Sequence, residues 1–255
     1  MSRFLILGLT LAFPLLGWAQ VDTDADFKRQ VYDREYTFGL IGHTRGYSIN
    51  GRYLKYLDGY NKLGFEFEFS KLRHPKEVRI PNQFYNNSRG YVFGRENSFY
   101  TVRTGMAYES IIFDKTDQGT ISIASFFSGG ISWGILKPIY MQILLPDSTG
   151  SPVSAQLVTV RYNHIEHGGS NIYGEANYFK GIGESKFRPG IYAKAGAVFD
   201  FDFLDKKVTS LEAGISYDYF FTEVPILYED EAGEDINEFG FLQFYLALNF
   251  GYKKQ

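Results

Sequence analysis

Residues 240–252 read GFLQFYLALNFGY, and the type of side chain alternates at every second position. The bulky apolar positions are Leu242, Phe244, Leu246, Leu248, Phe250 and Tyr252, and between them lie Gln243, Tyr245, Ala247, Asn249 and Gly251. A period of two is the period of a β-strand, in which successive side chains point to opposite faces of a sheet. The segment therefore predicts a strand with one bulky apolar face and one small or polar face.

The same alternation recurs upstream, for example in residues 63–70 (LGFEFEFS) and 209–221 (TSLEAGISYDYFF). Eight strands are predicted, with ten as the alternative count; the eight cover residues 35–44, 47–56, 62–73, 97–109, 120–136, 189–203, 209–221 and 239–252. Glycine inside a strand often marks a bulge, so Gly129 and Gly130 predict a bulge or a bend in the fifth strand.

Two all-β architectures fit this pattern. In a soluble sandwich the bulky face forms the core, whereas in a membrane barrel it faces lipid and the small or charged face lines the lumen. The connections favour the barrel: after a tight hairpin near 45–46, short connections at 57–61, 110–119 and 204–208 alternate with long ones at 74–96, 137–188 and 222–238. Short turns at one end and long loops at the other are typical of outer-membrane barrels. The sequence thus predicts one all-β domain over residues 35–255, a closed antiparallel up-and-down transmembrane β-barrel.

The first 20 residues, MSRFLILGLTLAFPLLGWAQ, predict export. Arg3 precedes an apolar run that ends in small residues, which is the order of a secretory signal peptide. The run is shorter than the roughly 20 apolar residues of a spanning helix. We expect residues 1–19 to be cleaved, residues 20–34 to form a periplasmic tail, and the protein to reside in the cell outer membrane.

Composition excludes several classes of function. The chain of 255 residues has no Cys, which rules out a disulfide scaffold, a Cys-ligated metal site and a thiol nucleophile. Its 26 Lys and Arg against 29 Asp and Glu give no basic surface for nucleic acid. Aromatic residues make up 18% of the chain and charged residues 22%, a mixture that disfavours a helical membrane bundle. No cofactor and no metal site is predicted.

Several short motifs add a family resemblance: His74-Pro75-Lys76-Glu77, Ser88-Arg89-Gly90-Tyr91-Val92-Phe93-Gly94, Asn97-Ser98-Phe99, Pro189-Gly190 and the final FLQFYLALNFGY. The final segment, together with the signal peptide and the strand pattern, resembles small outer-membrane β-barrels of the OmpX and OmpA transmembrane-domain type. The other four motifs are similar, more narrowly, to a group of uncharacterised Bacteroidota outer-membrane proteins. The resemblance implies a small membrane barrel and brings no catalytic residues. The chain departs from the family in its long 137–188 insertion and in ending on Gln255 instead of an aromatic residue.

The small or charged face predicts a network of charges in the lumen. The charged residues assigned to it are Arg52, Glu66, Glu68, Arg103, Glu109, Lys194, Glu212 and Asp218. The interior of an eight-stranded barrel is just wide enough for side chains to fill. Opposite charges should pair there, because an unpaired buried charge is costly. We therefore predict a plugged lumen and a structural or interaction-platform role; a proton or ion path is the alternative.

Basic residues gather where the third strand meets its long loop: Lys71, Arg73, Lys76 and Arg79. Lys and Arg at a membrane rim can make charge-assisted hydrogen bonds to the phosphates of lipopolysaccharide. We predict that these four side chains bind lipid phosphate, with an ordinary solvated loop as the alternative. The expected partners are outer-membrane lipid and another outer-membrane protein.

Histidines offer an alternative, an outer-membrane lipid-modifying enzyme. His43 lies near Ser48 in sequence, but a Ser–His pair also needs an orienting carboxylate. His164, Glu166 and His167 lie together but match neither the His-Glu-x-x-His nor the His-x-x-Glu-His metal motif. We assign no catalytic residue. A third interpretation is an accessory subunit of a larger envelope complex.

Overall fold

The computed structural model describes residues 32–80, 90–114, 121–145, 156–163, 166, 172–201, 206–228 and 238–255. The predicted signal peptide, residues 1–19, lies outside the described residues, as does residues 20–31 of the predicted tail. Among the described residues the structure contains no candidate membrane-spanning helix.

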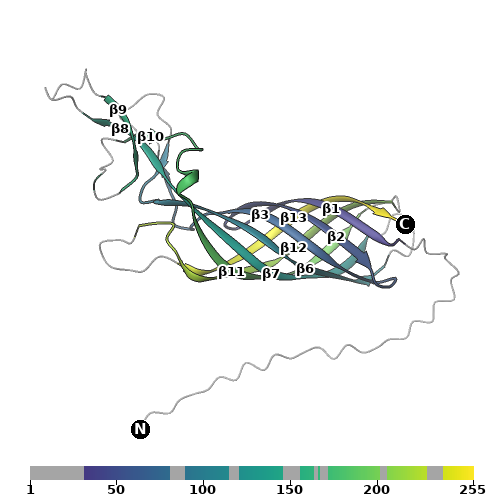
Figure 1. Cartoon of the computed structure of the whole chain (residues 1–255). Coiled ribbons are helices and arrows are strands. Elements are labelled where there is room, and N and C mark those ends of the chain that lie inside the picture. Colours follow the sequence, from purple (N-terminus) through teal and green to yellow (C-terminus); the bar gives the residue numbers. More distant parts are fainter. Residues whose placement is uncertain are drawn as a thin grey trace, which may run out of the picture. The chain divides into compact units, whose positions relative to one another are not determined.

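Eight antiparallel strands close into a barrel (Figure 1). They are β1 (Arg34–His43), β2 (Gly46–Tyr56), β3 (Asn61–Leu72), β6 (Asn97–Phe113), β7 (Ser122–Pro138), β11 (Lys186–Asp200), β12 (Lys207–Val224) and β13 (Glu238–Lys254). Each strand pairs with the next barrel strand in the chain, and β13 pairs back onto β1 in a continuous register from Arg34↔Lys254 to His43↔Tyr245. The predicted closed eight-stranded barrel is confirmed, and the ten-stranded alternative is wrong.

The two ends of the barrel differ in their connections. The connections 57–60, 114–121 and 201–206 lie at one end, here called the turn end, together with the C-terminus (Figure 1). The connections 73–96, 139–185 and 225–237 lie at the opposite end, here called the loop end, as does the short turn between β1 and β2. The predicted alternation of short and long connections therefore places all the long ones at the loop end.

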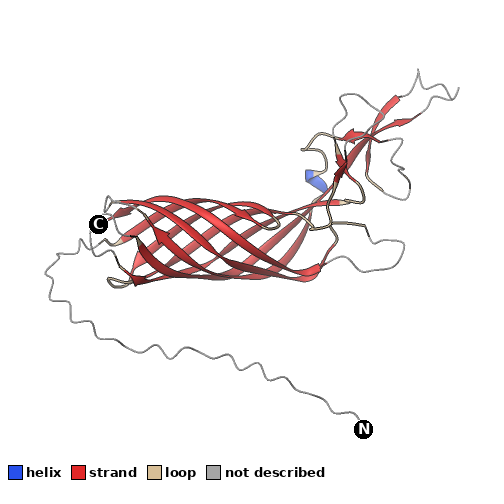
Figure 2. Cartoon of the chain, turned by 180° about the vertical axis from the view of Figure 1, so that it is seen from behind, coloured by secondary structure: helices blue, strands red, loops and turns tan. Residues whose placement is uncertain are grey.

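The long connections contain short strands that the sequence analysis did not predict. Within 74–96, β4 (Arg79–Ile80) pairs with β5 (Tyr91–Val92). Within 137–188, β8 (Tyr140–Leu145), β9 (Gln156–Arg161) and β10 (Ile172–Glu175) form a sheet in the order β10-β8-β9, followed by the 3₁₀ turn η2 (Ile182–Glu184), which is blue in Figure 2. This three-stranded sheet has a small core of its own: Tyr91, Ile139, Met141, Ile143, Tyr162 and Ile172. Burial raises the pKa of the Tyr162 hydroxyl, which accepts a hydrogen bond from the Gly94 N–H at 3.1 Å.

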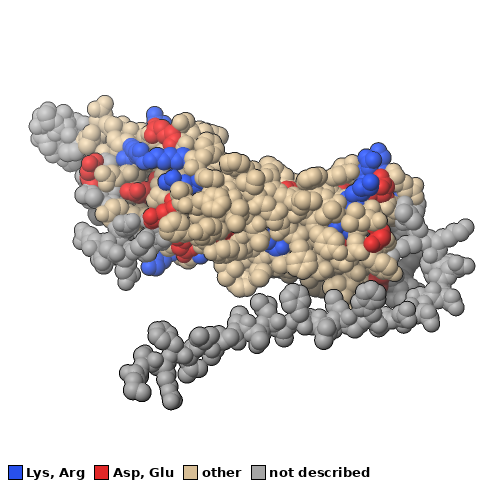
Figure 3. Space-filling view, turned by 60° about the horizontal axis from the view of Figure 1, so that its bottom comes forward, with Lys and Arg blue, Asp and Glu red and all other residues tan. Residues whose placement is uncertain are grey.

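The two faces of the barrel strands differ as the alternation predicts. On β13, Leu246 is 58% exposed on the outside, whereas Ala247 and Asn249 are 0% and 2% exposed and point inward. Charged side chains gather towards the two ends of the surface visible in Figure 3 and are sparse along the middle of the barrel. The outer wall therefore carries an apolar band.

The predicted bulge at Gly129 and Gly130 is wrong, because β7 pairs with β6 and β11 without a register shift through both glycines. Gly130 instead allows two strands to approach closely. A Cβ added at Gly130 would collide with the carbonyl oxygen of Thr104 on β6. Glycine is required there because any side chain would push the two strands apart.

This contact predicts that Gly130→Ala lowers the free energy of unfolding by about 1–3 kcal/mol, the usual effect of overpacking. Gly51→Ala is the matched control, because a Cβ at Gly51 meets no atom within 4 Å. It should be neutral or raise stability by up to about 1 kcal/mol. Urea titration, with the folded fraction read from unboiled gels, measures both. Equal effects of the two substitutions would contradict this role for Gly130.

Candidate functional site

The structure places all eight charged residues predicted for the lumen inside the barrel. Each is at most 6% exposed: Arg52, Glu66, Glu68, Arg103, Glu109, Lys194, Glu212 and Asp218. They come from five strands, β2, β3, β6, β11 and β12, and Glu109 lies in the turn-end half of β6. Seven of the eight join in one network and the eighth lies apart from it.

Arg52 and Lys194 hold the middle of this network. The Arg52 guanidinium binds Glu212 with two hydrogen bonds, of 2.5 Å and 3.0 Å, and donates from Nε to Glu66 at 2.8 Å. Lys194 Nζ bridges Glu66 at 3.3 Å and Glu68 at 3.1 Å. These contacts tie β2, β3, β11 and β12 together across the lumen through pairs of opposite charge.

Arg103 extends the network towards the loop end. Its guanidinium donates to both carboxylate oxygens of Asp218, at 2.9 Å and 2.5 Å, and to Glu68 at 2.6 Å. Asp218 also accepts hydrogen bonds from Ser132 and Gln243, at 3.0 Å and 2.8 Å. Two-pronged arginine–carboxylate pairs are both strong and directional. They fix the relative positions of the strands that carry them.

Glu109 belongs to a second group near the turn end. Lys62 Nζ contacts Glu109 at 2.7 Å and Glu35 at 2.9 Å, and the Tyr56 hydroxyl donates to Glu35 at 2.8 Å. The sequence analysis missed Lys62 and Glu35. The signal for Lys62 was present, since it has the same strand parity as Glu66 and Glu68 on β3. An apolar layer separates the two groups: Leu54, Ala107, Ala124, Phe126 and Val198.

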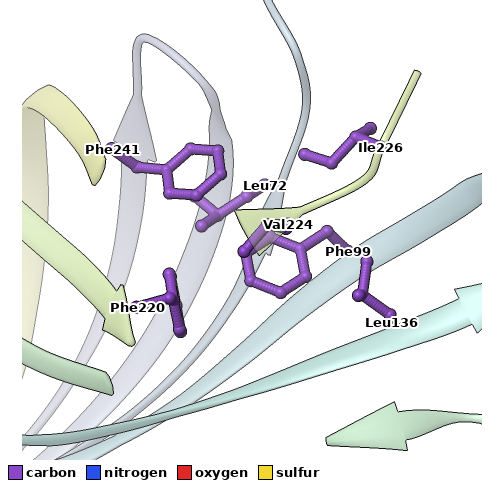
Figure 4. Packing of buried hydrophobic residues seen from close by; sticks show 7 residues of the cluster. All are labelled: Leu72, Phe99, Leu136, Phe220, Val224, Ile226 and Phe241. Carbon is purple, nitrogen blue, oxygen red and sulfur yellow. The ribbon is translucent and has the colours of Figure 1, made fainter. Parts of the chain in front are cut away.

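Seven buried apolar side chains form a cap inside the loop end (Figure 4): Leu72, Phe99, Leu136, Phe220, Val224, Ile226 and Phe241. The Phe99 ring lies 5.1 Å from that of Phe220 and 5.5 Å from that of Phe241, between centroids. The chain after β12 is fixed over β6 because the Ile226 carbonyl accepts hydrogen bonds from the N–H groups of residues 96 and 97. The cap lies between the charge network and the loop end.

The histidines do not assemble a catalytic site among the described residues. His43 points into the barrel, and its Nε2 lies 3.1 Å from Ser70 Oγ, not from the Ser48 that the sequence suggested. Its Nδ1 is buried with no hydrogen-bond partner in the described part of the chain, so no carboxylate orients the ring. His164 and His167 lie outside the described residues, and Glu166 is exposed. No group of three His, Cys, Asp or Glu that could hold a metal ion occurs where the structure is described.

The four basic residues predicted to bind lipid phosphate are not brought together into one site. Lys71 lies at the loop end of β3 with its Nζ 5.7 Å from the centre of the Tyr100 ring. Arg73 is exposed immediately after β3, and Lys76 is exposed in the following turn. Arg79 lies on β4, where its Nε donates to the Gly90 carbonyl at 3.2 Å.

Lys137, which lies outside the predicted strands, is a further basic residue at the loop end. Lys137 is the penultimate residue of β7, which extends beyond the predicted strand end at 136. Its Nζ lies 4.9 Å from the centre of the Tyr178 ring, and the Tyr178 hydroxyl donates to that of Tyr100 at 2.7 Å. No pattern in the sequence indicates this contact, because Tyr178 comes after β8, β9 and β10 in the chain and is therefore far from Lys137 in sequence.

Comparison with known proteins gives structural likeness only. No protein-family model and no curated protein matches the sequence. The structure is similar to that of Neisserial surface protein A, at 8% identity and a TM-score of 0.40, over 87% of this chain and 96% of that one. It is also similar to the N-terminal β-barrel domain of Pseudomonas aeruginosa OprF, at 9% identity and a TM-score of 0.37, over 87% and 97% of the two chains. A third similar structure is that of Ail, the attachment invasion locus protein of Yersinia pestis, at 9% identity and a TM-score of 0.33, over 88% and 99%.

The network predicts that Arg103→Met lowers the free energy of unfolding by about 3–5 kcal/mol, because it leaves Glu68 and Asp218 buried with one cation fewer. Arg34→Met is the control, since the ion pair of Arg34 is with its exposed neighbour Asp33 at the barrel surface, and it should leave the urea midpoint unchanged. Adding Glu68→Gln and Asp218→Asn to Arg103→Met should recover part of the loss. If Arg103→Met alone is neutral, the arginine does not hold the lumen together.

Proposed function

We propose that this chain is an integral protein of the cell outer membrane, exported by means of a signal peptide in residues 1–19, with a sealed barrel that carries an interaction platform. The observation that carries the proposal is that polar and apolar side chains are arranged in the opposite way to those of a soluble protein. Charges fill its interior, while large apolar side chains such as Leu246, Leu248 and Phe250 are at least 50% exposed on its outer wall. Contiguous exposed apolar surface of this extent needs an apolar surrounding. Closure of the sheet provides the paired backbone that a bilayer demands.

The lumen supports a structural role and not a pore. Its charges are paired, and the apolar cap around Phe99, Phe220 and Phe241 lies between them and the loop end. An ion would have to displace aromatic side chains and then compete with arginine–carboxylate pairs. Catalysis has less support, because the ring of His43 has no orienting carboxylate.

The platform is the three-stranded sheet at the loop end. β9 is paired on one side only among the described strands, and Leu157 on it is 46% exposed. The expected occupant is another outer-membrane protein, for which this chain would serve as an accessory subunit. The basic residues Lys71, Arg73, Lys76 and Arg79 would face the phosphates of outer-leaflet lipopolysaccharide around the platform.

Expression in a Gram-negative bacterium tests the proposal. The protein should stay in the outer-membrane fraction after alkaline extraction, and it should migrate faster unboiled than boiled, as a compact barrel does in detergent. In planar bilayers, the same folded sample should give no steady single-channel steps. Release as a water-soluble protein would contradict the membrane location, and steady steps would contradict the sealed lumen.

A further inference from the structure

The segment between β10 and η2 packs onto the outside of the barrel at the loop end. Tyr100 has the parity of the outward-facing residues on β6, yet it is only 6% exposed. Tyr178 covers it on one side, through the 2.7 Å hydrogen bond between the two hydroxyls and an edge-to-face packing of the rings at 6.4 Å. On its other side the Tyr100 ring stacks on Phe69, with centroids 6.0 Å apart. The barrel wall therefore carries an aromatic shelf built from Phe69, Tyr100 and Tyr178.

Two lysines border this shelf, and neither forms an ion pair with a carboxylate in the described part of the chain. Lys71 Nζ lies 5.7 Å from the centre of the Tyr100 ring and Lys137 Nζ lies 4.9 Å from that of Tyr178. Among the described residues no carboxylate oxygen comes within the 4.0 Å of an ion pair to either ammonium group. The nearby carboxylates of Glu77 and Glu175 are bound to Arg95, at 3.2 Å and 3.0 Å.

Lys137 is the more informative of the two, because it is only 8% exposed. An ammonium group held this close to an apolar surface is unfavourable unless an anion compensates it. A cation–π contact with tyrosine offsets part of the cost, and an anionic ligand would offset the rest. The ligand that fits must bring negative charge to the rim of an apolar wall.

The surroundings of the lysines identify the rest of that ligand. Phe179 and Ile182, on the segment that follows Tyr178, are 73% and 50% exposed, and Phe187 at the start of β11 is 67% exposed. Below them, Trp133 continues the outward face of β7 at 45% exposure. Apolar side chains beside unpaired cations suit an amphiphile with an anionic head and hydrocarbon tails. An acidic segment of a soluble protein would leave these side chains uncovered.

We propose that Lys71 and Lys137, held by the Tyr100–Tyr178 pair, bind the phosphate of a phosphorylated glycolipid in the outer leaflet, whose acyl chains lie along Phe187 and Trp133. The site deepens the proposed function and rests on it, because the lipid reaches the shelf only if the barrel spans the membrane. Of the four basic residues predicted from sequence, only Lys71 belongs to this site; its second cation is Lys137, which is nearly buried and forms no ion pair among the described residues.

Native mass spectrometry of the full chain in mild detergent tests the site. The protein should bind bis-phosphorylated lipid A about tenfold more tightly than the same lipid without its phosphates, the discrimination expected of charge-assisted hydrogen bonds. K71Q/K137Q should remove this difference. K55Q is the matched control, since Lys55 is an exposed lysine near the turn end of β2 and should keep the full preference.

Three results would overturn the site: equal binding of the two lipids by the unchanged protein, an undiminished preference in K71Q/K137Q, or complete displacement of lipid A by equimolar inorganic phosphate. A preference for an acidic peptide over lipid A would assign the shelf to a protein partner instead. Unboiled gels show whether each variant is folded, and the comparison of the two lipids needs no variant. A folded, membrane-bound protein without the preference would refute the site and leave the proposed function standing.

Discussion

The pairing of β13 with β1 is the constraint on which the structure depends. In hydrocarbon a backbone N–H or C=O has no water to bond, so a sheet that spans a membrane cannot leave a free edge. The ten paired positions from Arg34↔Lys254 to His43↔Tyr245 close that edge. Once the sheet is closed, each strand side chain points either into the lumen or out from the outer wall. Because the strands alternate with a period of two, the charged side chains point into the lumen and the large apolar ones point outward.

The lumen charges make this sorting specific. A slip of one residue in the pairing of β3 would turn Glu66 and Glu68 to the outer wall and bring Phe65 and Phe67 inside. It would also strip Arg52, Arg103 and Lys194 of their carboxylates. A buried ion pair adds little net stability by itself, but breaking one is strongly unfavourable. The network therefore acts mainly against wrong registers, and the apolar cap packs beside it at the loop end.

Sequence predicted what depends on local alternation. The strand at 239–252 and the inward position of Glu212 and Asp218 follow from a period of two, and both agree with the structure. Gly129 and Gly130 were misread because a glycine needed for close approach to Thr104 looks the same in sequence as one at a bulge.

What sequence missed depends on contacts between distant segments. The sheet of β8, β9 and β10 is built from short strands with no clear alternation, and β10 reaches β8 only across the long connection. The contact of Lys137 with Tyr178 depends on the same long connection, in which Tyr178 lies. Conversely, Lys71, Arg73, Lys76 and Arg79 were grouped because they are near in sequence, yet Arg79 is held on β4. Residues that are close in sequence therefore did not form a single binding site in this connection.

Accessibility along β13 is the most direct measurement of the central claim, that the bulky side of each strand touches lipid. The chain has no cysteine, so a single Cys at each position from 242 to 250 carries a unique spin label. In liposomes, labels at even positions should respond to oxygen dissolved in the bilayer, and those at odd positions should respond weakly to oxygen and to a water-soluble nickel reagent. Labels at the even positions that respond mainly to the water-soluble reagent would contradict the account.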